Sequence, residues 1–169
     1  IPGERGAPAS RVEWRRMAVE SIDRLIGCGV YYGAARSDAG LAQGKDVYLI
    51  GAGNSAGQSA LFFSNYAQSV TLIVRAESLA LSMSQYLIEQ IATKPNIRVE
   101  TRSEVVATHG DKRLEAIEII DRRTGATSRR DTEALFILIG ADATTDWLPT
   151  EIACDSHGFV LTGTDAMKE

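Results

Sequence analysis

Short apolar runs and segments of helical spacing alternate through the middle of the chain. The runs are rich in Val, Ile and Leu, as in β-strands, whereas the segments between them repeat apolar side chains along one helix face. The expected elements are a strand over 47–50, a helix over 54–68, a strand over 70–74, a second helix and a strand over 97–100. The second helix is capped by Ser78 or by Ser82 and ends at residues 93–96. This order predicts a parallel sheet whose strands are joined by right-handed crossovers.

The pattern changes from crossovers to hairpins after residue 100. The next short runs cover residues 105–108, 114–121 and 127–133. The turn signals Gly110-Asp111 and Thr124-Gly125 separate them, which indicates an antiparallel meander. The arginine pairs 122–123 and 129–130 are interpreted as cross-strand charge pairs on this solvated ribbon. Residues 135–139 are all apolar, as in a central parallel strand, so the sequence predicts an α/β, Rossmann-like three-layer domain with a central parallel sheet and an antiparallel β-meander flap.

The two ends of the chain have a weaker pattern. Ser10 and Glu13 form a capping box, and imperfectly spaced apolar residues up to Ile26 favour one amphipathic helix. A last strand is expected over 159–161, and Ile1 in place of an initiating Met indicates an excised or processed fragment. The expected parts are an N-terminal loop and helix (1–26), a Rossmann-like domain (27–165) and a tail (166–169).

A glycine motif lies between the first expected strand and helix. Gly51-Ala52-Gly53-Asn54-Ser55-Ala56 fits the pattern GxGxxA. Gly51 permits the tight turn, Gly53 lets a pyrophosphate approach the backbone, and Ala56 lets the helix pack close to the strand. The positive end of the helix dipole attracts phosphate groups. We therefore expect all six residues to bind a dinucleotide, with a purely structural glycine turn as the alternative.

The end of the second expected strand predicts which dinucleotide binds. An NAD site usually has Asp or Glu at this place, but here Val74 is followed by Arg75, and Glu77 comes two residues later. A guanidinium can pair with the 2′-phosphate of NADP. The sequence therefore predicts NADPH rather than NADH, with Val74 and Arg75 in the site. The alternative is a solvated arginine just beyond a strand.

Composition and charge narrow the class of partner. Of the 169 residues, 44% are hydrophobic and 24% are charged, which is ordinary for a globular protein. The net charge of −4 is opposite in sign to that of most proteins that bind nucleic acid phosphates. No apolar stretch, 135–139 included, approaches the ~20 residues of a membrane helix. Neither nucleic acid nor a membrane is therefore expected as a partner.

The spacing of cysteine and histidine gives no support for metal or nucleophilic chemistry. Cys28 and Cys154 form no CxxC pair, which argues against a disulfide scaffold and favours a reducing compartment, the cytoplasm. His109 and His157 have no ligand-type neighbours at metal-binding spacing, so no metal site is expected. No catalytic triad can be placed, and we assign no catalytic residue.

Five segments of the chain follow one another in a recognisable order. They are Gly27-Cys28-Gly29-Val30-Tyr31-Tyr32, residues 47–56, residues 70–75, Ile137-Leu138-Ile139-Gly140 and Gly158-Phe159-Val160. In this order they resemble thioredoxin reductase and its FAD-dependent relatives, the pyridine nucleotide-disulfide oxidoreductases. The resemblance implies an NADPH-binding domain inserted in an FAD-binding domain, in which hydride passes from NADPH to the flavin. It also adds Ile139 and Gly140 to the expected cofactor-binding residues.

The chain also departs from the pattern of that family. The redox-active CxxC would fall at residues 33–36, which read Gly-Ala-Ala-Arg. The His-Arg-Arg phosphate motif would fall at residues 74–76, where one arginine remains. The FAD glycine motif and the closing Gly-Asp motif are absent. The resemblance therefore implies the NADPH-binding part of a flavin oxidoreductase without the dithiol, inactive as this isolated chain, with FAD bound only in a full-length parent.

The expected partners follow from the resemblance. They are the dinucleotide, the FAD-binding domain of the parent chain, a redox carrier protein such as a ferredoxin, and a second copy in a homodimer. A stand-alone NAD(P)-binding regulatory module without catalysis is the alternative of a different class. A self-contained dehydrogenase is disfavoured, because the sequence contains no YxxxK pair.

Overall fold

The computed structural model describes residues 12–143, 152–154 and 161. The chain divides into two compact units, one formed by 17–139 and the other by 1–16 together with 140–169. In the latter, strands β1 (Val12–Trp14) and β10 (Ala141–Ala143) pair in antiparallel fashion, with Trp14 opposite Ala141. The main-chain N–H of Arg15 donates to the carbonyl of Gly140 at 3.1 Å. We call this pair of strands the entry–exit ribbon.

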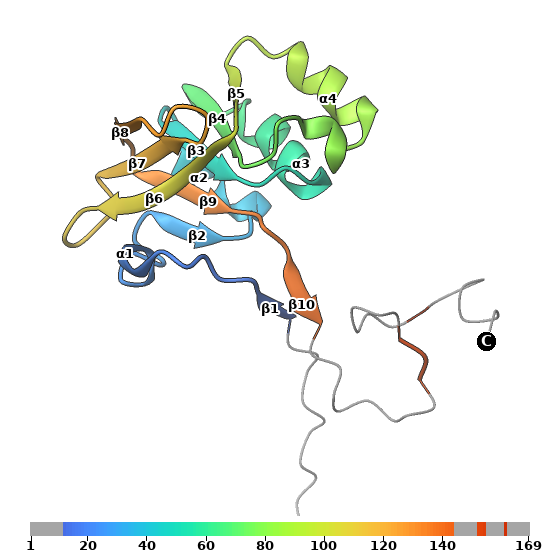
Figure 1. The fold of residues 1–169 in the computed structure, drawn as a ribbon, viewed down its shortest axis with the longest axis horizontal. Helices are drawn as coiled ribbons and strands as arrows, with labels where there is room; N and C mark the ends of the chain where they lie inside the picture. The colour runs from blue at the N-terminus through green and yellow to red at the C-terminus, as the bar shows by residue number, and fades with distance from the viewer. Residues whose placement is uncertain (1–11, 144–151, 155–160, 162–169) are drawn as a thin grey trace, which may run out of the picture. The chain divides into compact units, whose positions relative to one another are not determined.

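The unit 17–139 contains two sheets and several short helices (Figure 1). Its elements are α1 (Glu20–Asp23), β2 (Val30–Tyr32), a 3-10 turn (Arg36–Asp38), α2 (Ala39–Ala42), β3 (Asp46–Ile50), α3 (Asn54–Phe63), β4 (Ser69–Val74), a 3-10 turn (Leu79–Leu81), α4 (Gln85–Ala92), β5 (Ile97–Thr101), β6 (Ser103–His109), β7 (Ala116–Asp121), β8 (Thr127–Asp131) and β9 (Ala134–Ile137). The first sheet is parallel, in the order β2-β9-β3-β4-β5, and the second is antiparallel, in the order β6-β7-β8.

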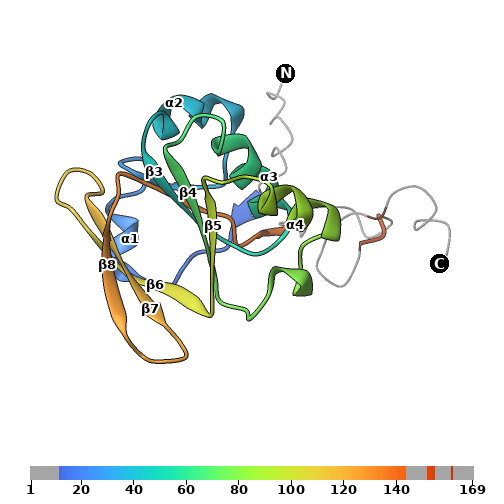
Figure 2. The ribbon, with the colours of Figure 1, turned by 90° about the horizontal axis from the view of Figure 1, so that it is seen from above.

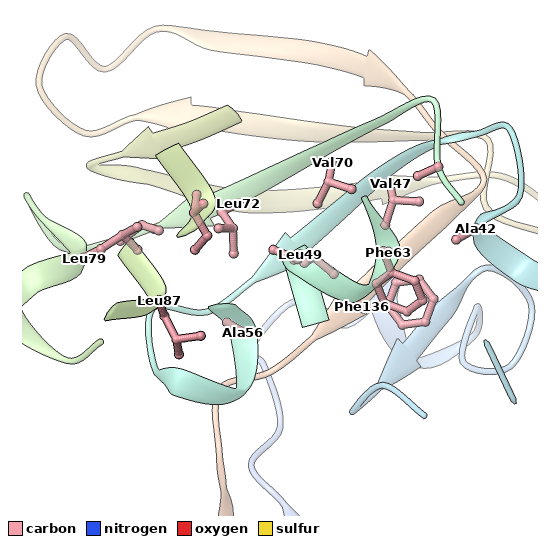
Figure 3. Packing of buried hydrophobic residues seen from close by; sticks show 14 of the residues in the cluster. Ala42, Val47, Leu49, Ala56, Phe63, Val70, Leu72, Leu79, Leu87 and Phe136 are labelled. Carbon is pink, nitrogen blue, oxygen red and sulfur yellow. The ribbon is translucent and has the colours of Figure 1, made fainter. Parts of the chain in front are cut away.

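The parallel sheet lies between helices α3 and α4 on one face and the β6-β7-β8 meander on the other (Figure 2). Side chains alternate along each strand, so β3 sends Val47 and Leu49 to the helices and Tyr48 and Ile50 to the meander. On the helix side, Phe63 of α3 lies over the sheet (Figure 3). Because both faces are covered there, strands β3, β4 and β9 are apolar at most positions. The predicted fold class is confirmed.

One local prediction about the first quarter is wrong, and one strand there was not predicted. The helix expected over 10–26 is limited to α1, and Val12–Trp14 is a strand. The apolar residues Val12, Met17 and Ile22 are five positions apart, which turns them about 140° from one another on a helix, so they share no face. Strand β2 was not predicted, because it has only three residues and its parallel pairing with β9 is non-local.

Some expectations fall on residues outside the described part of the chain. These are the tail over 166–169 and most of the last strand over 159–161, of which only Leu161 is described. The domain limits 27 and 165 remain predictions. In the part of the chain that is described, no helix is long and apolar enough to span a membrane.

Candidate dinucleotide-binding site

Gly51 connects β3 to the glycine turn at a place where no side chain fits. Its φ of +149° is a conformation that residues with a side chain rarely adopt. A Cβ at this position would lie 2.5 Å from the Leu138 carbonyl oxygen and 3.1 Å from the Cβ of Ala56. Gly51 therefore allows the strand, the helix and the end of β9 to approach one another closely, as the motif predicts.

Gly53 has the opposite environment. Its backbone is extended, with φ −84° and ψ 178°, and a Cβ placed on it would meet nothing within 4 Å. Gly53 is the N-cap of α3, which has no side-chain cap and no acidic residue in its first turn. The positive end of this helix is thus not neutralised by a carboxylate of its own first turn. An open glycine at such a helix end suits the close approach of a phosphate.

The segment 82–84 holds the glycine turn in place. The Ser82 hydroxyl donates to the Ala52 carbonyl at 2.9 Å, and the main-chain N–H of Ser84 donates to Asn54 Oδ1 at 2.8 Å. Asn54 was predicted to contact the cofactor, but its side-chain oxygen is used to bind this neighbouring segment. The sequence suggested Ser82 only as a helix cap, and helix α4 begins later, after Ser84. Ser82 and Ser84 are therefore positioning residues that the sequence patterns did not reveal.

Replacing Ser82 with alanine should weaken the binding of NADPH and NADH equally, by about two- to fivefold. The variant loses one hydrogen bond that fixes the Ala52 carbonyl, and a typical hydrogen bond contributes about 1 kcal/mol. Isothermal titration calorimetry would measure both dissociation constants. Ser64→Ala is the matched control, since Ser64 makes the same type of bond, to the Leu61 carbonyl at 2.8 Å, at the far end of α3. Unchanged constants in Ser82→Ala would show that this bond does not position the turn.

Arg75 lies at the same edge of the sheet as the glycine turn. Strands β3 and β4 are parallel neighbours, with Ile50 opposite Ile73, so their carboxyl ends are adjacent. Val74 is buried in the core on the helix side, so only its backbone can contact a ligand. The Arg75 side chain is 67% exposed, and its Nε lies 3.6 Å from Glu104 Oε1. Arg75 is thus an accessible cation at the position that the sequence predicts for the 2′-phosphate.

Two further arginines, not predicted for the site, join Arg75. Arg122, which follows β7, donates from Nε to Glu104 Oε2 at 2.8 Å and also contacts it through Nη2. Arg102 pairs with Glu77 at 2.7 Å, and its main-chain N–H donates to the Ala76 carbonyl at 2.9 Å. We call Arg75, Arg102, Arg122, Glu77 and Glu104 the charge cluster. Its three cations and two anions give a net charge of +1 beyond β4.

The other predicted site residues differ in how far they are exposed and in what they pack against. Ser55 is exposed in the first turn of α3, whereas Ala56 is fully buried against the sheet. Ile139 is half-buried and packs with the core on the meander side. Its neighbour Leu138 is the residue whose carbonyl faces Gly51. Gly140 belongs to the other compact unit, where it has a φ of +94°.

Of the hairpin arginines, Arg122 makes a cross-strand pair as expected, whereas Arg123 and Arg129 make local pairs. Arg123 donates to the Asp121 carboxylate at the turn, and these hydrogen bonds lower the pKa of Asp121 to about 2. Arg129 lies 3.9 Å from Asp131 on the same strand. Arg122 turns instead to Glu104 on β6. Among the described residues, no three His, Cys, Asp or Glu side chains come together as a metal site, and Cys28 and Cys154 are unpaired.

Comparison with known proteins agrees with this geometry. The family model described as "Pyridine nucleotide-disulphide oxidoreductase" matches residues 17–166. The chain is 30% identical over 146 residues to thioredoxin reductase of Streptomyces clavuligerus, covering 86% of this chain and 44% of that protein. It is 29% identical over 152 residues to a component of the alkyl hydroperoxide reductase of Staphylococcus epidermidis, covering 90% of this chain and 29% of that protein. The chain thus spans less than half the length of these relatives.

Solved structures show the same fold. Thioredoxin reductase from Giardia duodenalis superposes with a TM-score of 0.79 at 23% identity, over 90% of this chain and 49% of that one. Thioredoxin reductase from T. acidophilum superposes with a TM-score of 0.77 at 24% identity, over 90% and 50% respectively. The resemblance inferred from the sequence motifs is therefore confirmed.

Proposed function

Because the chain belongs to the pyridine nucleotide-disulphide oxidoreductase family, we propose that it is the NADPH-binding domain of an FAD-dependent oxidoreductase similar to thioredoxin reductase. Its role is to deliver hydride from NADPH to the flavin. The observation that carries this proposal is the open Gly53 at the N-terminus of α3, at the same sheet edge as the exposed Arg75. The nicotinamide coenzyme supplies the hydride when it is bound, and this chain binds and orients the coenzyme.

The residues on this edge fit a phosphorylated dinucleotide. The first turn of α3 offers main-chain N–H groups to a pyrophosphate, and Gly53 leaves room for it to approach. Gly51 and Ala56 keep the turn closed, and Ser82 fixes it from the neighbouring segment. Arg75 offers a charge-assisted bond to a 2′-phosphate. Ile139 and Gly140 remain proposed ligands.

The electron acceptor is proposed to be a separate redox protein. Residues 33–36 hold no cysteine where the resemblance places the dithiol, and the two cysteines of the chain are far apart in the sequence. The named relatives include thioredoxin reductase and a component of alkyl hydroperoxide reductase. We place FAD in a second domain of the parent protein and expect electrons to leave from the flavin to a carrier such as a ferredoxin. The proposed compartment is the cytoplasm.

The coenzyme preference tests this proposal. The chain should bind NADPH about tenfold more tightly than NADH, because a single exposed guanidinium adds about 1.4 kcal/mol to the binding of the 2′-phosphate. Arg75→Ala should remove the preference and leave the NADH dissociation constant nearly unchanged. Added salt should reduce the preference of the unmodified chain, since an exposed ion pair is screened.

A closely matched control is available at the opposite end of the sheet. Arg113 is 69% exposed and lies 3.6 Å from Glu133, much like Arg75 beside Glu104, but Glu133 precedes β9 and so lies at the amino edge of the sheet. Arg113→Ala should leave the dissociation constants of both coenzymes unchanged. Tighter binding of NADH than of NADPH by the unmodified chain would contradict the assignment, and binding of neither would overturn the proposed function.

A further inference from the structure

Arg75, at the end of β4, shares its partner carboxylate, Glu104, with Arg122. Glu104 lies on β6 with one carboxylate oxygen 3.6 Å from Arg75 Nε and the other 2.8 Å from Arg122 Nε. Its side chain is 23% exposed, much less than that of Arg75. Two hydrogen bonds from Arg122 hold this carboxylate in position. Arg75 is therefore accompanied by a fixed negative charge that solvent screens only partly.

This negative charge opposes the binding of one coenzyme and not of the other. A 2′-phosphate that pairs with Arg75 comes close to the Glu104 carboxylate, and like charges repel. The uncharged 2′-hydroxyl of NADH meets no such repulsion. Glu104 also neutralises part of the Arg75 charge before any ligand arrives. Both effects change the ratio of the NADH and NADPH dissociation constants rather than the affinity for both coenzymes.

We propose that Glu104 is a specificity-determining residue that limits the preference for NADPH, by neutralising Arg75 and repelling the 2′-phosphate. This inference rests on the proposed function, since it concerns the same coenzyme site. This ion pair keeps the affinity for NADPH closer to that for NADH. The sequence offers no sign of the role, because Glu104 follows Arg75 by 29 positions and is brought to it by β5 and β6.

The substitution Glu104→Gln separates charge from shape. The glutamine amide oxygen can still accept the hydrogen bonds from Arg122, so the side chain stays in place while its negative charge is removed. The dissociation constant of NADPH should fall about three- to tenfold, and that of NADH should change by less than about twofold. In the Arg75→Ala background, the same substitution should change the NADPH constant by less than about twofold. Without Arg75 there is no cation to neutralise, and nothing holds the 2′-phosphate beside residue 104.

Glu133→Gln provides the control for a change of net charge. Glu133 also bridges two cations, Lys45 at 3.2 Å and Arg113 at 3.6 Å, but at the amino edge of the sheet. Its substitution should leave both constants within about twofold. Glu104→Thr supplies a second neutral residue suited to a strand, in case the glutamine variant does not fold. It too should increase the ratio of NADH to NADPH dissociation constants.

Calorimetric titration of the 169-residue chain with NADPH and with NADH decides the matter. An increased ratio in Glu104→Gln, absent from Glu133→Gln, supports the inference. A folded Glu104 variant whose ratio is unchanged or lower overturns it and marks Glu104 as a structural ion-pair residue, while the proposed function stands. The inference is also overturned if Glu104→Gln increases the ratio equally in the Arg75→Ala background. If the unmodified chain binds neither coenzyme, the proposed function and this inference both fall.

Discussion

Replacing Gly53 with valine should lower the affinity for both NADPH and NADH at least tenfold, about 1.4 kcal/mol, while the domain stays folded. Gly53 has an extended backbone that any residue can adopt, and a Cβ there meets nothing within 4 Å. The valine side chain therefore enters without strain. It would, however, occupy the space at the N-terminus of α3 into which we expect the pyrophosphate to come. The loss is common to both coenzymes, because both carry that pyrophosphate.

The measurement is a pair of calorimetric titrations, with the circular dichroism spectrum as the test of folding. Gly40→Val is the control, since Gly40 also has open space around its Cβ position and no positive φ, but it lies in α2, which precedes β3. Its dissociation constants should match those of the unmodified chain. If folded Gly53→Val binds the coenzymes as well as the unmodified chain, the glycine turn is purely structural and the dinucleotide site must be sought elsewhere.

Replacing Gly51 with alanine should destabilise the fold, lowering the free energy of unfolding by about 2–4 kcal/mol. Alanine must adopt a φ of +149°, which strains its backbone, and its Cβ would lie 2.5 Å from the Leu138 carbonyl oxygen. That oxygen belongs to the main chain and cannot rotate away as a side chain would. The strand, the helix or the end of β9 must therefore move apart, and core contacts are lost.

Urea unfolding followed by circular dichroism would measure this change. Gly53→Ala, two residues away, is the control and should change the free energy of unfolding by less than about 0.5 kcal/mol. A Gly51→Ala variant as stable as the unmodified chain would mean that the backbone relaxes at this position without loss of packing. Together the two variants test whether Gly51 serves the fold and Gly53 the binding of the coenzyme.

Local patterns were sufficient to predict most of the unit 17–139. Strands β3, β4 and β9 are apolar at nearly every position because both faces of the sheet are covered, and that pattern is visible in the sequence. The meander was marked by its turn signals, and the glycine motif by its place between a strand and a helix. At the N-terminus, the capping-box signal at residues 10–13 was outweighed by the pairing of β1 with β10.

The parts of the candidate site that were missed are held by non-local contacts. Arg102 lies beside the end of β4 because β5 pairs with β4, and Arg122 shares Glu104 with Arg75 because β7 pairs with β6. Nothing near Arg75 in the sequence indicates either arginine. Ser82 reaches the glycine turn across 30 positions. Such pairings depend on the tertiary fold. Local sequence patterns therefore predict the strands, the helix and the glycine turn of the site better than the polar residues around them.

The entry–exit ribbon has a consequence for the transfer of this segment of chain by recombination. Trp14 and Ala141 are opposite each other in the register although they are distant in sequence. The two ends of the segment 14–141 therefore lie side by side. Recombination that transfers β1, β10 and all the residues between them keeps both partners of this strand pair together. A crossover within either strand would separate the partners and leave an open strand edge, the kind of edge that promotes aggregation.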